Sequence, residues 1–290
     1  MPLGLPDPFT QVSVCAVDLN TGWTIDQNAD VQWPLASIAK LGWVLALHRD
    51  AAAGNIDLSE RILLDPGSRT PGPTGISRMH DPVELSLRDA AFSALSASDN
   101  ACADAIWDRL GPELVLDHCA QLGMANAARH PMRYIYESMA ADLNVSDKAT
   151  ALDKMASLPD ERITQLTMLN SGLANAATVR DLANLLAGVW RRRDLRPERA
   201  ALQLMSQATV PSPLRAQLDS PDISIFSKTG TLLTLRHEAG IVNYPDGATY
   251  AVAVCTRVAS LQHVVRRDGA LSYLFGQCMS QLRNRPNYAK

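Results

Sequence analysis

Short runs of apolar residues near both ends of the chain predict β-strands. Near the N-terminus, the runs 12–17 and 23–25 flank a polar turn at 18–22, which is the pattern of a β-hairpin. Three further runs of this kind lie near the C-terminus, at 223–226, 238–243 and 249–257, with the turn Pro245-Asp246-Gly247 between the last two. The pattern therefore predicts five strands, two from one end of the chain and three from the other.

Between these ends, apolar residues recur at helical spacing. Residues 38–48 are almost wholly apolar, with Lys40 as the one charged residue, and this predicts a buried helix. A helix at 263–282 would pack on the sheet. Residues 125–175 contain only short helical fragments between prolines and glycines. Spacing of the i, i+3, i+4 kind predicts further helices at 86–97, 100–110, 113–122 and 178–190.

Elements in this order predict an α+β fold, an α/β sandwich. A five-stranded antiparallel sheet from both chain ends would be flanked by helices, with an all-helical lobe inserted. We predict that 1–36 and 208–290 form the α/β lobe and that 37–207 form the helical lobe. A chain of 290 residues with 47% hydrophobic content can bury a sizeable core. The cleft at the seam of the two lobes is the expected place for a site.

Composition and charge argue against several classes of function. The net charge of −3 comes without a basic stripe, so no nucleic-acid partner is expected. The one tight basic run, 191–193, follows an apolar helical stretch, where cations suit a helix C-terminus. No apolar stretch is long enough for a membrane span. The five cysteines lack CxxC spacing and lie in apolar contexts, which favours buried thiols, and neither a metal site nor a cofactor is expected.

The N-terminal segment MPLGLPDPFTQ lacks the basic and apolar regions of a signal peptide. We therefore expect a cytoplasmic protein as the sequence stands, or a periplasmic or secreted one if an export signal has been removed. The sequence predicts no particular oligomeric state.

Three short motifs appear in order and supply the candidate chemistry: Ser37-Ile38-Ala39-Lys40, Ser98-Asp99-Asn100 and Lys228-Thr229-Gly230. The first opens the buried helix, the second lies between two helices, and the third ends a strand. Each has a structural alternative when taken singly, such as a helix cap for Ser37 or a turn glycine for Gly230. All three in this order are expected by chance in about one such chain in a thousand.

With these motifs the chain resembles class A β-lactamases and penicillin-binding proteins, which share them. The resemblance covers nearly the whole chain except about residues 125–175. It implies a metal-independent serine hydrolase that forms an acyl-enzyme at Ser37 with a small-molecule β-lactam or a related amide or ester. An esterase, a transacylase or a D,D-peptidase on the same scaffold is an alternative. A β-lactam-binding sensor without turnover is an alternative of another class.

The residue types explain how such a site would work. Lys40 lies one helical turn from Ser37, so both side chains share a face. As a base it must be neutral near pH 7, so its pKa would have to fall from about 10.4 to about 7. Burial and a second cation, Lys228, both act in that direction. Ser98 would relay a proton between the two amines.

Other residues would bind the substrate. Ser37 at a helix N-terminus can offer its backbone N–H to an oxyanion, and the resemblance implies the N–H of Thr231 as the second donor. Asn100 could bind Lys40 or a substrate amide. Asp99 is expected to be only the N-cap of the following helix. The resemblance implies that the substrate carboxylate is bound by the third motif, Lys228, Thr229 and Gly230.

One part of the family pattern is missing. Class A β-lactamases carry a glutamate between the second and third motifs that activates the deacylating water, and no matching element stands here. The family spacing leads to Tyr134, where Glu137 is the nearest carboxylate and a weak candidate for the base. Glu161 is another, and a surface position is expected for both. Fast deacylation is therefore not expected.

The roles of two residues beyond the third motif remain open. Arg236 or His237 could help to bind an anionic substrate. Both could equally be solvated strand residues, which is the interpretation we favour.

Overall fold

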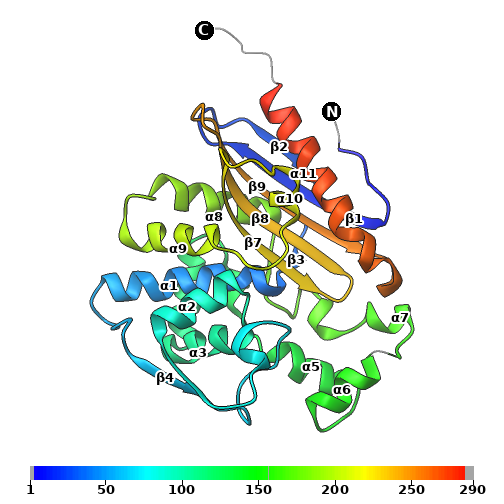
Figure 1. The fold of residues 1–290 in the computed structure, drawn as a ribbon. Helices are drawn as coiled ribbons and strands as arrows, with labels where there is room; N and C mark the ends of the chain where they lie inside the picture. Colours follow the sequence, from blue (N-terminus) through cyan, green and yellow to red (C-terminus); the bar gives the residue numbers. More distant parts are fainter. Residues whose placement is uncertain (1–2, 156, 285–290) are drawn as a thin grey trace.

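The structure, a computed structural model, describes residues 3–155 and 157–284. Its centre is a five-stranded antiparallel sheet in the order β2–β1–β9–β8–β7 (Figure 1). The pairing of β1 with β9 joins the two ends of the chain. The predicted fold class is confirmed. The strands are β1 (Phe9–Asp18), β2 (Thr24–Gln27), β7 (Ser224–Leu232), β8 (Leu235–Asn243) and β9 (Thr249–Val258).

The predicted N-terminal hairpin is present, and its turn is stabilised by Asp18. The Asp18 carboxylate accepts from the backbone N–H of Asn20 at 2.9 Å and of Thr21 at 3.1 Å. Gly22 has φ +79°, a conformation that L side chains adopt at a cost. This short turn returns the chain directly beside β1.

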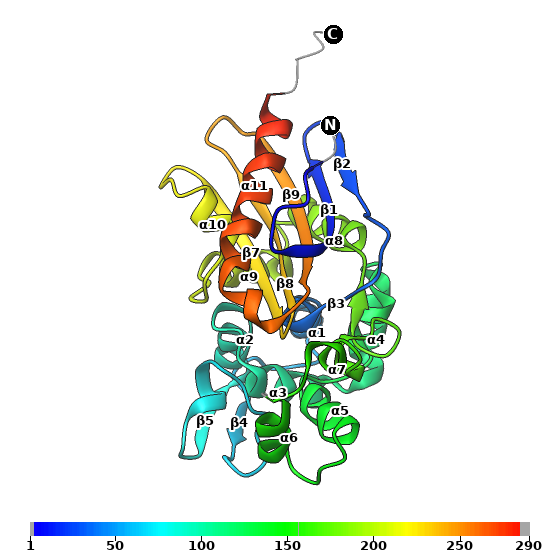
Figure 2. The same cartoon turned by 90° about the vertical axis from the view of Figure 1, so that its right-hand side faces the viewer.

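Helices cover both faces of the sheet. Helix α11 (Arg267–Arg283) packs on one face, and α8 (Val179–Arg191) packs on the other (Figure 2). Alternate residues of β1 therefore enter two different cores: Val14 meets the α11 side, whereas Cys15 meets the α8 side. The predicted boundary between the lobes, at 207/208, remains a prediction. This boundary assigns α8 to the helical lobe, although α8 contacts the sheet.

The helical part is built around α1 (Lys40–Ala52), which follows the 3-10 turn η1 (Ala36–Ala39). Its side chains are buried from Lys40 to Leu47, as the apolar run predicts, and Trp43 meets Trp107 edge-on at 4.8 Å between ring centroids. The helices predicted around it are confirmed to within a few residues. The helices that contact α1 are α2 (Leu87–Ser96), α3 (Asn100–Leu110), α4 (Pro112–Gln121) and α9 (Arg196–Ser206).

Residues 125–175 fold into short helices and 3-10 turns, as the sequence pattern predicts. The two ends of this segment are joined by a pair of hydrogen bonds: His130 N donates to Asn175 Oδ1 at 2.9 Å, and Asn175 Nδ2 donates to His130 O at 2.7 Å. Residue 156 lies outside the described residues. The elements are η3 (Ala125–Ala128), α5 (Tyr134–Asp142), α6 (Lys148–Met155), α7 (Asp160–Ile163) and η4 (Thr167–Leu169).

Short elements complete the fold. One of them, η5 (Leu261–Arg266), overlaps the start of the helix predicted at 263–282, and the others were not predicted because so few residues give no readable period. All five cysteines are buried and free, as expected. Among the helices that the structure describes, none is both long and apolar enough to cross a bilayer. The short elements are the pair β3 (Trp33–Pro34) and β6 (Ala176–Ala177), the pair β4 (Arg61–Leu64) and β5 (Val83–Ser86), η2 (Gly75–Arg78), α10 (Pro213–Gln217) and η5 (Leu261–Arg266).

Candidate active site

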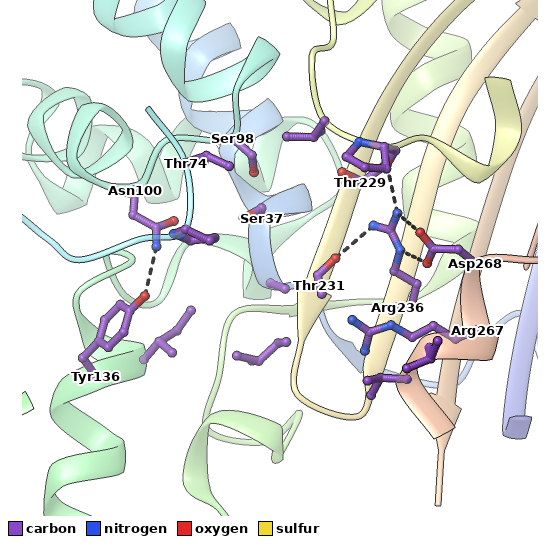
Figure 3. A pocket seen from close by; sticks show the side chains of 18 residues that line it. Ser37, Thr74, Ser98, Asn100, Tyr136, Thr229, Thr231, Arg236, Arg267 and Asp268 are labelled. Carbon is purple, nitrogen blue, oxygen red and sulfur yellow. Dashed lines mark hydrogen bonds and ion pairs between the residues drawn. The ribbon is translucent and has the colours of Figure 1, made fainter. Parts of the chain in front are cut away.

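A cavity of about 430 Å³ opens where the sheet meets the helices (Figure 3). Ser37 reaches it from η1, and Ser98 reaches it from the turn between α2 and α3. Strand β7 contributes Thr229 and Thr231 to its opposite wall. Segments far apart in the sequence therefore meet at one cavity, as the ordered motifs predict.

Asp99 holds the turn that presents Ser98. Its carboxylate accepts from Ala101 N at 2.9 Å, which confirms the predicted N-cap of α3. The same carboxylate also accepts from Ser77 Oγ at 2.7 Å and from Ile76 N. It therefore connects the 3-10 turn η2 to the N-terminus of α3. Ser98 has φ +61°, which is uncommon for a residue other than glycine. The cap therefore stabilises a costly backbone conformation next to the cavity.

Lys40 lies fully buried in the first turn of α1 and bonds two acceptors. Its Nζ donates to Ser98 O at 2.5 Å and to Asn100 Oδ1 at 2.7 Å. Burial lowers the pKa of Lys40 to about 7, although the charges of Asp99 and Asp104 act in the opposite direction. A neutral amine has two N–H bonds, enough for these two acceptors, and a lone pair that can take a proton.

Lys228 approaches the same serine from β7. Its Nζ donates to Ser98 Oγ at 2.8 Å and to Thr229 O at 3.0 Å. Burial lowers the pKa of Lys228 well below its usual range, and the charges of Lys40 and Arg236 add to this. Two buried amines thus meet at one residue, one at its carbonyl and one at its hydroxyl. The structure brings the motif residues together, and their catalytic roles remain predictions.

Gly230 allows β7 to pass directly against η1. A Cβ at this position would lie 2.7 Å from Leu35 O and 3.1 Å from Ile38 Cγ1. The backbone contact leaves no flexible side chain to move aside, so any larger residue must push η1, and with it Ser37, away from the strand.

Replacing Gly230 with alanine should destabilise the protein by about 1–3 kcal/mol, the usual cost of overpacking. It should also slow any reaction of Ser37, because η1 shifts. Unfolding by urea measures the free energy of unfolding, and the rate at which Ser37 is acylated measures its reactivity. Gly269 in α11 is the matched control, because its Cβ would meet no atom within 4 Å. Equal stabilities of Gly230→Ala and Gly269→Ala would contradict this account of the contact.

Arg236 crosses the far end of the cavity. Its Nε donates to Asp268 Oδ1 at 2.7 Å, and its Nη1 donates to Thr231 Oγ1 at 2.9 Å (Figure 3). His237 faces the opposite side of the sheet, where its Nε2 lies 3.1 Å from Pro34 O. The favoured interpretation of solvated residues is wrong for both, since Arg236 is 5% exposed and His237 is fully buried. The reason is that β8 is an inner strand with both faces covered.

The comparison with known proteins agrees with this geometry. Residues 7–271 match the family described as the beta-lactamase enzyme family. The chain belongs to this family.

Two kinds of relatives accompany the family match. "Beta-lactamase regulatory protein BlaB" of Streptomyces cacaoi is 33% identical, and the match covers 82% of this chain and 82% of that protein. The crystal structure of a beta-lactamase from Sphaerobacter thermophilus has a TM-score of 0.73 at 24% identity and covers 96% and 93% of the two chains. A class A beta-lactamase from Mycobacterium abscessus has a TM-score of 0.76 at 17% identity and covers 96% and 95%. The two structures establish the β-lactamase fold.

The wall of the cavity formed by α5 lacks the carboxylate that is expected of an enzyme that deacylates quickly. Glu137 is exposed and does not line the cavity, because it leaves α5 in a different direction from Tyr136. Glu161 is also exposed. Tyr136 does line the cavity, and its hydroxyl accepts from Asn100 Nδ2 at 3.4 Å (Figure 3). Burial raises the pKa of the Tyr136 phenol.

Within the described residues, the carboxylate that lines the cavity is Asp268. Both of its oxygens are engaged by Arg236, at 2.7 and 3.1 Å. Sequence reasoning did not find Asp268 or Tyr136. Both lie in segments without a motif, and only the tertiary fold brings them beside Ser37.

Proposed function

We propose that this member of the β-lactamase family acylates Ser37 with a β-lactam or a related amide or ester. The observation that supports this most directly is the meeting of Lys40 and Lys228 at Ser98. Burying two amines together is costly unless the arrangement serves a reaction. A lysine with a pKa of about 7 is a base suited to neutral pH.

The proposed acylation step gives each motif residue a role. The Ser37 hydroxyl attacks the carbonyl carbon of the substrate, and its proton passes to the lone pair of Lys40. The backbone N–H groups of Ser37 and Thr231 would bind the oxyanion. The C–N or C–O bond then breaks, and the leaving atom takes a proton from Ser98 Oγ. A protonated Lys228 replaces this proton through its 2.8 Å hydrogen bond and becomes neutral, while Lys40 keeps the proton of Ser37.

The opposite wall favours an anionic substrate. Thr229 and Thr231 offer hydroxyls to the cavity, and the Arg236 guanidinium lies behind Thr231. Asp268 neutralises part of that charge and fixes the plane of the guanidinium. A carboxylate on the substrate would therefore meet oriented donors.

A second candidate is a β-lactam-binding sensor that releases its ligand slowly. The wall at Tyr136 favours it, because no carboxylate of the described residues is free to activate water beside Ser37. A relative whose name calls it a regulatory protein is consistent with this role. Both candidates share the acylation step and differ in the fate of the acyl-enzyme.

Incubation with a penicillin, followed by intact mass and product over time, separates these functions. We expect a mass gain equal to one penicillin that is absent in Ser37→Ala. Product accumulating over many turnovers supports the hydrolase, whereas a persistent adduct supports the sensor. The proposal of a β-lactam substrate fails if no adduct and no product form. If esters are then cleaved in a Ser37-dependent way, the chain is an esterase on the same scaffold.

A further inference from the structure

A second cavity lies at the opposite end of α1 from Ser37. Its volume is about 550 Å³, and α1, α2 and α9 line it. These three helices contact one another in all pairs, and Figure 1 shows them stacked, with α9 above α1 and α2 below it. Small-molecule sites are usually preformed cavities of about 300–1,000 Å³. The proposed acylation uses none of the residues in this one.

Contacts between the helices fix the walls of this cavity. Glu198 of α9 is buried and binds Arg49 of α1, with Nη2 and Oε1 2.8 Å apart. Ser96 at the end of α2 donates from Oγ to Leu204 O of α9 at 3.0 Å. The spacing of α1 and α2 from α9 is therefore set before any ligand binds.

The floor of the cavity is apolar. Phe92 stands at its edge and is 44% exposed. An exposed aromatic side chain beside this cavity would be removed from water by a ligand with an apolar body. We define the floor as five apolar residues of the lining: Ala51, Ala52, Leu58, Ala200 and Leu204.

The polar groups of the cavity are suited to an anion. His48 lines the cavity, but its Nε2 is buried and out of reach of a ligand. Burial, assisted by the charge of Arg88, lowers the pKa of His48 to about 4, so the ring is neutral and adds no charge to the cavity. Arg88 and Arg196 line the cavity, and neither guanidinium forms an ion pair within the described part of the chain. The one lining carboxylate, Asp89, already accepts from Ser86 Oγ at 2.7 Å.

We propose that this cavity binds a small amphiphilic carboxylate. Its alkyl chain covers the apolar floor, and its carboxylate is held by Arg88 and Arg196. A medium-chain fatty acid has this combination of a single negative charge and a flexible apolar body.

Titration calorimetry of the full chain with octanoate tests the site. We expect saturable binding of one octanoate per chain, and binding of hexanoate about 15-fold weaker, since each buried methylene contributes about fourfold. Arg88→Ala should weaken octanoate binding about tenfold or more, because it removes a charge-assisted hydrogen bond. Arg191→Ala is the matched control, since Arg191 is exposed at the end of α8 and does not line the cavity.

Two further variants distinguish this cavity from the one at Ser37, which also contains an arginine. Ala200→Phe should fill the floor and abolish octanoate binding, while Arg236→Ala should leave it intact. The NMR signal of the His48 ring should shift on binding only in the chains that bind. The proposal is overturned if octanoate gives no saturable heat. It is also overturned if Arg88→Ala and Ala200→Phe bind like the unchanged chain, or if Arg236→Ala loses binding.

Discussion

Replacing Lys40 with methionine should slow acylation of Ser37 by about 10²–10⁴-fold, the usual contribution of a positioned general base. Methionine keeps the length and the apolar stem of the side chain but removes the amine that bonds Ser98 O and Asn100 Oδ1. The measurement is the rate of adduct formation with a penicillin, followed by intact mass. Lys154→Met is the control, because Lys154 is exposed on α6. Acylation of Lys40→Met at the rate of this control would exclude Lys40 as the base.

The pH dependence of the same rate gives an independent check. Lys40 can accept the Ser37 proton only when it is neutral, and its pKa is about 7. Acylation should therefore be slow at acid pH, rise through pH 7 and level off in the alkaline range. The rise should disappear in Lys40→Met. A rate that falls as the pH increases through 7 would require a protonated lysine and a different base.

Most of the fold was predictable because its elements have a strong period or a clear turn. The apolar run after Ser37 predicts the buried helix, and the polar turn ending at Gly22 predicts the hairpin. The ordered motifs predict that Ser37, Ser98 and Lys228 are neighbours, and in the structure Ser37 and Ser98 line one cavity while Lys228 bonds Ser98. These inferences succeeded because each depends on residues close together in the sequence, or on a pattern shared by a family.

The wrong prediction for Arg236 has a different physical origin. Arg236 stands in an inner strand whose residues are buried from Leu235 to Val242. A charge in such a strand must be paired, but its partner, Asp268, lies on α11 and has no signal that links the two in the sequence. Glu238 in the same strand is likewise satisfied by Ser212, at 2.5 Å. An arginine or glutamate within an apolar inner strand thus predicts a buried pair, although not the identity of the partner.

The segment 125–175 was the least predictable because its structure depends on closure of its ends. The paired hydrogen bonds between His130 and Asn175 join its ends, and within it α5 presents Tyr136 rather than Glu137 to the cavity. A shift of one residue along α5 turns a side chain by about 100°. Spacing counted from Ser98 cannot determine such a rotation.

The acyl-enzyme of the unchanged chain should be long-lived, and Tyr136→Glu should speed its hydrolysis by about tenfold to a hundredfold. The reason is that a carboxylate at this wall supplies a base to the cavity. The effect should not exceed the lower limit of the usual 10²–10⁴-fold contribution of a general base, because the position of the carboxylate is not optimised. Decay of the penicillin adduct, measured by mass after excess penicillin is removed, reports the rate directly.

Tyr136→Gln is the matched variant, since glutamine has the size of glutamate without its basicity. If Gln accelerates hydrolysis as much as Glu, the tyrosine acts only by excluding water, and the missing base is not the limiting factor. Tyr136→Phe tests the hydroxyl bonded to Asn100 and should leave the adduct long-lived. Rapid turnover by the unchanged chain would show that another group activates water, and the sensor function would then be excluded. The wall at Tyr136 therefore decides between the two functions that the acylation machinery permits.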